Sequence, residues 1–165
     1  MNYYYLYKQY KLKYIELKNQ IGGSKFIIKS KDFDNKSNLP EKFTCSGEKK
    51  QPNLFWENPP NNTKSFVLIL DDPDAPNGTF THLIAINISN NKNSLDGHTE
   101  FAKNSMNNNK YIPPCPLSGK HRYIFKLYAL DKEIKLDSDM DKAQVLKKIK
   151  NNIIEETKLL TYFEK

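Results

Sequence analysis

The sequence predicts a mainly β fold, built as one domain with a helix at each end. Three observations lead to this prediction. The length of 165 residues suits one ordinary domain. Short apolar runs separated by proline, glycine and asparagine clusters fill the middle of the chain. Helical spacing of apolar residues occurs only before and after them. We therefore divide the chain into an N-terminal helical extension at residues 1–23 and one domain at residues 24–165.

The first segment, about residues 3–21, is predicted to be an amphipathic helix that Gly22-Gly23 ends. Its apolar residues are spaced four, four, three and four apart, with lysines between them: Leu6, Tyr10, Tyr14, Leu17 and Ile21. We expect this helix to pack on the domain or on a second copy of the chain. The alternative is a basic, aromatic helix lying on an anionic membrane. It is less favoured because the polar face is not purely basic and the apolar face is mostly tyrosine.

Four runs are predicted to form strands: Phe26 to Ile28, Ser65 to Leu70, His82 to Ile88 and Arg122 to Leu130. The third and fourth are almost continuously apolar or aromatic, which is typical of strands buried on both faces or in the middle of a sandwich. The polar segment from Asn90 to Lys110 is an unusually long loop. Loops of that length usually bind something or close a site.

The chain is predicted to end in a helix from Ser138 to about Leu160, packed on a sheet. Ser138 and Asp141 resemble a capping box at its start. An apolar stripe then follows at Leu146, Ile149 and Ile153.

The formal net charge of +7 does not by itself indicate nucleic-acid binding. Arg122 is the only arginine, and the lysines are scattered among acidic residues instead of forming one basic stripe. We therefore expect no nucleic-acid partner.

The sequence predicts a cytoplasmic protein, with peripheral membrane contact not favoured. No stretch approaches the roughly 20 apolar residues that cross a bilayer, and the first residues lack the apolar core of a secretion signal. Cys45 and Cys115 are too few for a secreted disulfide framework and lack the paired spacing of a zinc site. Both are expected to be reduced thiols.

Residues suited to chemistry gather in three segments where strands meet loops. A stiff acidic corner, Asp71 to Pro76, follows the second predicted strand. His82 opens the third strand, and a proline-rich loop, Pro113 to Lys120, leads to His121-Arg122-Tyr123 at the start of the fourth. We expect these strand ends to converge at one end of a single sheet.

The arginine at position 122 stands out in a chain that otherwise uses lysine. A guanidinium pairs with a carboxylate through two hydrogen bonds, a geometry that lysine cannot match. Asp72 and Asp74 are the candidate partners, and we expect Arg122 to be largely buried in such a pair.

Three motifs in a fixed order carry a resemblance to a known family: Asp72-Pro73-Asp74-Ala75-Pro76, then Thr81-His82 running into Asn87-Ile88, then Pro114-Cys115-Pro116 followed by Gly119 and His121-Arg122-Tyr123. The sequence resembles the phosphatidylethanolamine-binding protein family, also called Raf kinase inhibitor-like proteins, and most closely its compact bacterial branch. The resemblance covers about Phe26 to Tyr162, so the N-terminal helix lies outside it.

This resemblance implies an antiparallel β-sandwich with a small surface pocket for phosphate-like anions and phospholipid head groups. The matching positions are Asp72, His82, Pro114, His121 and Tyr123, and Asp74 and Arg122 are expected to support them. Two imidazoles can each donate a hydrogen bond to a phosphoryl oxygen, and a carboxylate behind one of them can fix its tautomer. The expected function is anion binding, with no catalysis, metal or cofactor.

Two alternative functions stay open. The resemblance also allows an interaction module that inhibits a kinase or a protease, because a phosphate pocket can take a phosphorylated side chain. A hydrolase that uses Ser118 or Cys115 with His121, or a metal enzyme, is less favoured. The chain lacks a nucleophile-elbow motif, and its histidines are not closely spaced as a ligand pair.

The sequence departs from the family pattern at two positions beside these motifs. Leu83 stands where the family usually has an aromatic residue, so we expect one wall of the pocket to be reshaped. Pro113 replaces the glycine that commonly precedes Pro-Cys-Pro, and proline forbids the positive φ that glycine allows. The backbone conformation of this loop is therefore open.

Overall fold

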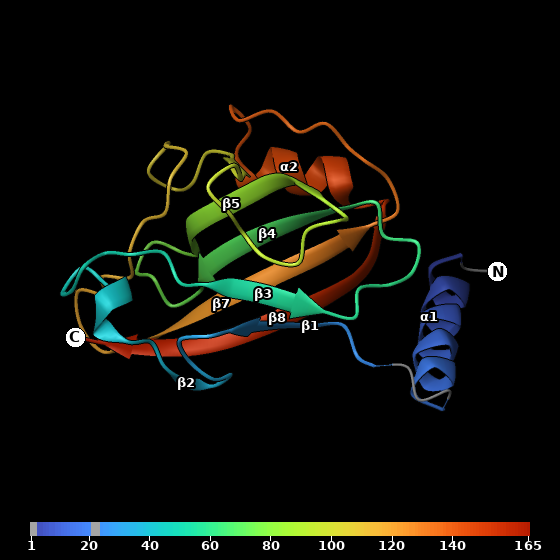
Figure 1. The fold of residues 1–165 in the computed structure, drawn as a ribbon, viewed down its shortest axis with the longest axis horizontal. Coiled ribbons are helices and arrows are strands. Elements are labelled where there is room, and N and C mark those ends of the chain that lie inside the picture. The colour runs from blue at the N-terminus through green and yellow to red at the C-terminus, as the bar shows by residue number, and fades with distance from the viewer. Residues whose placement is uncertain (1–2, 21–23) are drawn as a thin grey trace.

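The computed structural model describes residues 3–20 and 24–165, which form a mainly β molecule with two helices (Figure 1). The elements, in chain order, are α1 Tyr3–Gln20, β1 Ile27–Ser30, β2 Ser37–Asn38, the short 3₁₀ turn η1 Glu41–Phe43, β3 Leu54–Glu57, β4 Ser65–Asp72, β5 Phe80–Ser89, β6 Glu100–Phe101, β7 Lys120–Leu130, α2 Lys142–Ile149 and β8 Ile153–Glu164. The predicted mainly β class is confirmed.

Within the described residues, the strands form two sheets that pack as layers. The larger sheet has six strands in the order β2-β8-β7-β4-β5-β6, and β1 pairs with β3 in a smaller one. All these pairs are antiparallel except β2 with β8, which is parallel. The small sheet covers one face of the large sheet and α2 covers the other, so the central strands are shielded from water on both sides.

Strand β4 is buried along its whole length, as its continuous apolar run predicts. Phe66, Leu68 and Leu70 point into the core under the small sheet. Val67 and Ile69 point to the opposite face, into the core under α2. Alternate side chains of a strand lie on opposite faces, so one apolar run supplies both layers.

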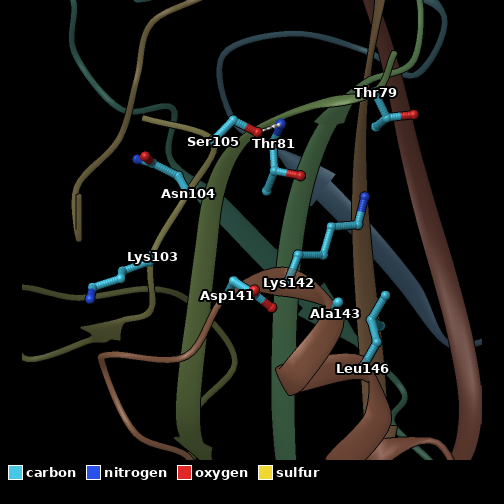
Figure 2. Close-up of a pocket in the computed structure, with 9 residues that line it drawn as sticks. All are labelled: Thr79, Thr81, Lys103, Asn104, Ser105, Asp141, Lys142, Ala143 and Leu146. Atoms are coloured by element: carbon cyan, nitrogen blue, oxygen red, sulfur yellow. Dashed lines mark hydrogen bonds between the residues drawn. The ribbon is translucent and has the colours of Figure 1, made fainter. Parts of the chain in front are cut away.

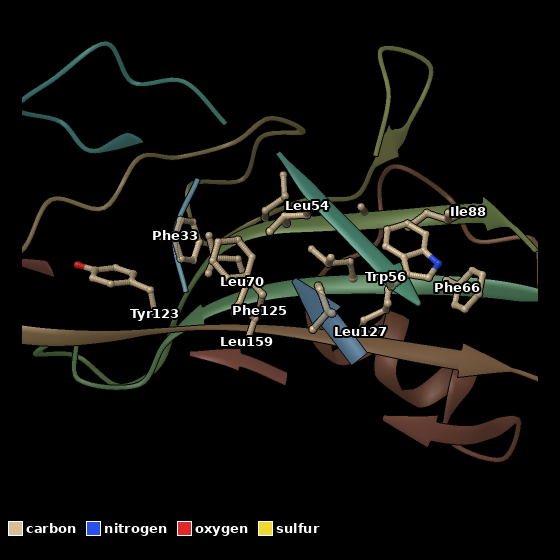
Figure 3. Packing of buried hydrophobic residues seen from close by; sticks show 14 of the residues in the cluster. Phe33, Leu54, Trp56, Phe66, Leu70, Ile88, Tyr123, Phe125, Leu127 and Leu159 are labelled. Carbon is tan, nitrogen blue, oxygen red and sulfur yellow. The ribbon is translucent and has the colours of Figure 1, made fainter. Parts of the chain in front are cut away.

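The core under the small sheet is rich in aromatic side chains (Figure 3). Trp56 of β3 packs on Phe66 with ring centroids 5.3 Å apart, and Phe33 lies 6.1 Å from Phe125 of β7. Strand β3, which sequence reasoning missed, brings Trp56 into this core. Its four residues are too short to show a clear alternation of apolar and polar positions.

Strand β5 changes phase at Asn87, which adopts a positive φ of 54°. The register with β4 slips there, so that Ala85 and Ile88 both face the small sheet although they are three residues apart. The side chain of Asn87 fixes this bulge, since it donates to Leu136 O at 3.0 Å and accepts from Leu136 N at 3.0 Å. Asparagine tolerates this backbone conformation better than most residues.

The predicted C-terminal helix is partly wrong. A helix is present, but it spans only Lys142–Ile149 and is followed by the long strand β8. Asp141, not Ser138, forms the capping box, with Gln144 as its partner. Beyond the helix the buried positions recur every second residue, at Thr157, Leu159 and Thr161, which is the period of a strand.

Helix α1 does not pack on the domain with its described side chains, so the first of the two expected packing partners is wrong, and packing on a second copy of the chain stays a prediction. Every residue from Leu6 to Tyr14 is exposed, including the large side chains Leu6, Tyr7, Tyr10, Leu12 and Tyr14. The structure does not describe the side chain of Leu17. Ile21 and the predicted stop at Gly22-Gly23 lie outside the described residues. In the described part of the chain, no helix has the length and apolar character to span a membrane.

A buried carboxylate joins α2 to the large sheet. Asp71 on β4 has an exposed fraction of 1%. It accepts hydrogen bonds from Lys126 of β7 at 2.8 Å, Lys142 of α2 at 2.7 Å and Thr81 of β5 at 2.8 Å. Burial opposes the charge on Asp71, but these hydrogen bonds outweigh burial and lower its pKa.

We expect Asp71→Asn to lower the free energy of unfolding by about 2 kcal/mol at neutral pH, because charge-assisted hydrogen bonds are lost. A carboxyl group whose pKa is lower in the folded protein stabilises the fold above its unfolded pKa of about 4. That stability is lost as the pH falls through the folded pKa. Urea unfolding at about pH 7 and about pH 3 measures both effects.

The exposed Asp34 provides the control for this substitution. Asp34→Asn should leave stability unchanged at both pH values. The role assigned to the ionised carboxylate would be contradicted if Asp71→Asn lowered the free energy of unfolding by the same amount at neutral and acidic pH.

Candidate functional site

A pocket of about 290 Å³ lies where β4 ends and where β5 and β7 begin. These three strand ends lie at the same end of the large sheet (Figure 1). The pocket brings together Asp72, His82 and His121, which come from three strands of one sheet, so the predicted convergence is confirmed. We call it the histidine pocket, and its full lining is Asp72, Ala75, Pro76, Phe80, His82, Ile112, Pro113, Cys115, Pro116, Leu117 and His121.

His121 is held by Asp72, and both residues line this pocket. The Nδ1 atom of His121 lies 2.7 Å from Oδ2 of Asp72, and both side chains are buried. A carboxylate oxygen accepts hydrogen bonds, so Nδ1 carries a proton and donates the hydrogen bond to Asp72. This contact fixes the ring and leaves Nε2 as the nitrogen available to a ligand.

His82 is held in a comparable way by a backbone carbonyl. Its Nδ1 atom lies 2.8 Å from the carbonyl oxygen of Ile112, so Nδ1 donates. Its Nε2 atom is buried and has no hydrogen-bond partner within the described residues. Burial lowers the pKa of His82, so this imidazole is neutral over more of the pH range than a free one.

The other walls of the histidine pocket are mostly apolar. Phe80 packs edge-on against the ring of His82, with the two centroids 4.7 Å apart. Leu117 stands at the rim with an exposed fraction of 87%. The lining of the histidine pocket thus combines two imidazoles with carbon surfaces.

Cys45 and Cys115 form a disulfide, so the expectation of two reduced thiols is wrong. Their Cα atoms are 5.3 Å apart although 70 positions separate them in the sequence. The spacing of the two cysteines along the chain cannot predict this contact, because only the folded structure brings them close together. Cys115 lines the histidine pocket, and Cys45 N donates to Pro114 O at 3.0 Å, so this segment braces the pocket wall.

Arg122 pairs with Asp74, which is one of its two predicted partners. The expectation that Arg122 is largely buried is wrong. Its Nη2 and Nε atoms donate to Asp74 oxygens at 2.6 and 2.9 Å, and its backbone N donates at 2.8 Å. These contacts lower the pKa of Asp74 to about 2. Arg122 lies between the inward-facing His121 and Tyr123 on a strand, so alternation turns its side chain, 51% exposed, to solvent.

Pro114 and Tyr123 lie beside the histidine pocket and do not line it. Pro114 is buried and contacts the Cys45 segment. The fully buried ring of Tyr123 packs edge-on against His82 with centroids 5.4 Å apart, and its hydroxyl has no partner among the described residues. The structure therefore places both behind residues that line the pocket.

The two departures from the family pattern have different consequences. Leu83 is buried in the core under the small sheet, so it does not reshape the pocket wall and that expectation is wrong. Pro113 does line the pocket. Sequence reasoning missed Phe80, and also Ile112, whose carbonyl orients His82. Only their position beside His82 and the proline-rich loop could have pointed to them.

A larger depression of about 360 Å³ lies between α2 and the segment after β6 (Figure 2). Several of its polar atoms already have partners in the chain: Ser105 Oγ accepts from Thr81 N at 2.8 Å, and Lys142 pairs with Asp71 at 2.7 Å. We therefore place the candidate site in the histidine pocket, where imidazole nitrogens remain for a ligand.

Comparisons with known proteins identify the family. A family model described as phosphatidylethanolamine-binding protein matches residues 29–164. A UPF0098 protein of Methanothermobacter thermautotrophicus is 34% identical over 148 residues, which cover 84% of this chain and 98% of that protein. A UPF0098 protein of Aquifex aeolicus is 39% identical over 123 residues, which cover 68% of this chain and 72% of that protein.

Two solved structures have the same fold. One, described as a phosphatidylethanolamine-binding protein homologue of Chlamydia trachomatis, has a TM-score of 0.81 and 32% identity, and covers 85% of this chain and 97% of its own. The other, Escherichia coli YbcL, has a TM-score of 0.79 and 25% identity, and covers 86% of this chain and 99% of its own. The chain therefore belongs to the phosphatidylethanolamine-binding protein family.

Proposed function

We propose that this protein binds phosphate-bearing anions, such as phospholipid head groups, in the histidine pocket. One observation carries the proposal. His82 and His121 each have Nδ1 engaged by a fixed acceptor, which leaves both Nε2 atoms for a ligand in one pocket. Two fixed N–H donors at an anion form charge-assisted hydrogen bonds when the rings are protonated.

The lining also indicates what the anion carries. Ala75, Pro76, Phe80 and Pro116 give the walls apolar surface, which a bare phosphate ion cannot cover. An organic phosphate with a short carbon chain fits both parts of the pocket. Phosphoethanolamine is therefore expected to bind more tightly than inorganic phosphate.

We propose binding without catalysis. The Cys115 sulfur is held in the disulfide, so it is not free to act as a nucleophile. Ser118 does not line the histidine pocket. The interaction-module alternative, with a kinase or protease partner, uses the same donors, and a titration with a phosphotyrosine peptide tests it in the same experiment.

The affinity for an oxyanion is expected to rise as the pH falls. A neutral imidazole that donates from Nδ1 can only accept at Nε2, whereas a protonated one donates from both nitrogens. Because the pKa of His82 is lowered, the increase should continue below the usual histidine value of about 6.5. Calorimetric titration with sulfate between about pH 7.5 and about pH 5 measures it, since sulfate stays a dianion throughout.

The same titration with phosphoethanolamine at acidic pH tests the ligand class. The expected result is that phosphoethanolamine binds at acidic pH and that sulfate binds more strongly at acidic than at neutral pH. A sulfate affinity that does not change with pH, or that falls on acidification, would refute the role of the imidazoles.

The cytoplasmic location expected from the sequence stays a prediction. The Cys45–Cys115 disulfide bears on it, because disulfides persist mainly in oxidising compartments. Thiol alkylation of protein taken directly from cells distinguishes the two cases. Labelling of both cysteines indicates a reducing compartment, and labelling of neither indicates an oxidising one.

A further inference from the structure

Helix α1 carries a face of exposed apolar side chains that its own domain does not cover. At about 100° per residue, Leu6, Tyr7, Tyr10 and Tyr14 fall within an arc of about 100°. All four are exposed, with exposed fractions from 42% to 72%. We call this set the tyrosine face.

Between Leu6 and Tyr14, the charges beside the tyrosine face are all positive. The segment from Leu6 to Tyr14 contains Lys8, Lys11 and Lys13 and no acidic residue. Lys11 and Lys13 lie on the two edges of the tyrosine face. A long lysine stem beside an apolar face can lie along it while its ammonium group reaches outward to a negative charge.

These features favour an anionic lipid surface over a second copy of the chain. Two copies joined through this face would bring lysines of like charge together. Tyrosine also suits the boundary between water and lipid, where the ring is buried and the hydroxyl stays hydrated. The helix cannot span the bilayer, so it would lie along its surface.

The helix also lies outside the residues that the family model matches. The family match begins at residue 29, and the Chlamydia trachomatis structure is covered over 97% of its length by 85% of this chain. The helix thus precedes the region that matches the family. We propose that α1 is a peripheral membrane-binding helix that attaches the domain to anionic lipid surfaces through the tyrosine face and its flanking lysines.

Vesicle sedimentation with the full chain tests this proposal. The vesicles contain either phosphatidylcholine alone or phosphatidylcholine with phosphatidylserine, and no phosphatidylethanolamine. We expect binding to the anionic vesicles, weakened by added salt. Lys11→Glu/Lys13→Glu should lower the partition coefficient about tenfold or more, and Tyr10→Ser/Tyr14→Ser should lower it in the same direction.

Lys147→Glu/Lys148→Glu is the matched control, because it makes the same change in net charge on the exposed side of α2. This variant should bind like the parent. Equal binding to both kinds of vesicle, no binding to either, or a loss only in the α2 variant would overturn the proposal. Sedimentation equilibrium adds a further test: a dimer that Tyr10→Ser/Tyr14→Ser dissociates, without vesicle binding, would assign the face to a second copy.

Discussion

Replacing His121 with alanine should weaken phosphoethanolamine binding at acidic pH by about ten- to a hundredfold. The change removes one charge-assisted donor, which is worth about 1.5–3 kcal/mol. It also leaves Asp72, which lies 2.7 Å from His121 Nδ1, as a negative charge facing the anion. His82→Ala should lower the affinity similarly. Calorimetric titration of the full chain measures both losses.

Two additional variants make this experiment interpretable. His98 is exposed and does not line the histidine pocket, so His98→Ala should bind like the parent. His121→Asn keeps an N–H group that can donate to Asp72 but loses the imidazole, so it separates binding from folding. If His121→Ala and His82→Ala both keep the affinity of the parent, with the fold intact by circular dichroism, the anion binds elsewhere.

Removal of the disulfide should have the largest effect on stability. The bond between Cys45 and Cys115 closes a loop with a sequence separation of 70, for which chain entropy predicts a loss of about 4 kcal/mol. Urea unfolding of Cys45→Ser/Cys115→Ser measures that loss. Because Cys115 lines the histidine pocket, phosphoethanolamine affinity should fall as well, as the wall is no longer tied to the Cys45 segment.

Reduction of the parent provides an independent check of the same bond. A reducing agent should lower the unfolding midpoint of the parent to that of the double serine variant. The variant itself should not respond to the reducing agent. A double serine variant as stable as the parent, or a parent that reduction leaves unchanged, would contradict the stabilising role of this bond.

The central strands were predictable because burial determines their composition. Strand β4 needs apolar residues on both faces, and its run of Phe66 to Leu70 shows this directly. The strand in the C-terminal segment was not predictable from the sequence, because apolar residues such as Ile149 and Ile153 satisfy a helical spacing. Only the partner strand β7 shows that the second of them belongs to a strand.

The candidate site was also only partly predictable from the sequence. His82 and His121 stand out in the sequence because a polar residue opens an apolar strand beside a proline-rich loop. The contact of His82 with the carbonyl of Ile112 leaves no mark in the sequence, since any residue supplies a carbonyl. The exposure of Arg122 follows from strand alternation, but only once the inward faces of His121 and Tyr123 are known.

The central claim is that both Nε2 atoms of the pocket histidines contact a bound phosphate. The chain has three histidines, so their imidazole nitrogens can be followed separately by NMR in the ¹⁵N-labelled protein. On titration with phosphoethanolamine, we predict that the Nε2 resonances of His82 and His121 shift together along one saturable curve while those of His98 stay in place. Equal shifts at all three histidines, or no shift at His82 and His121 at millimolar ligand, would contradict it.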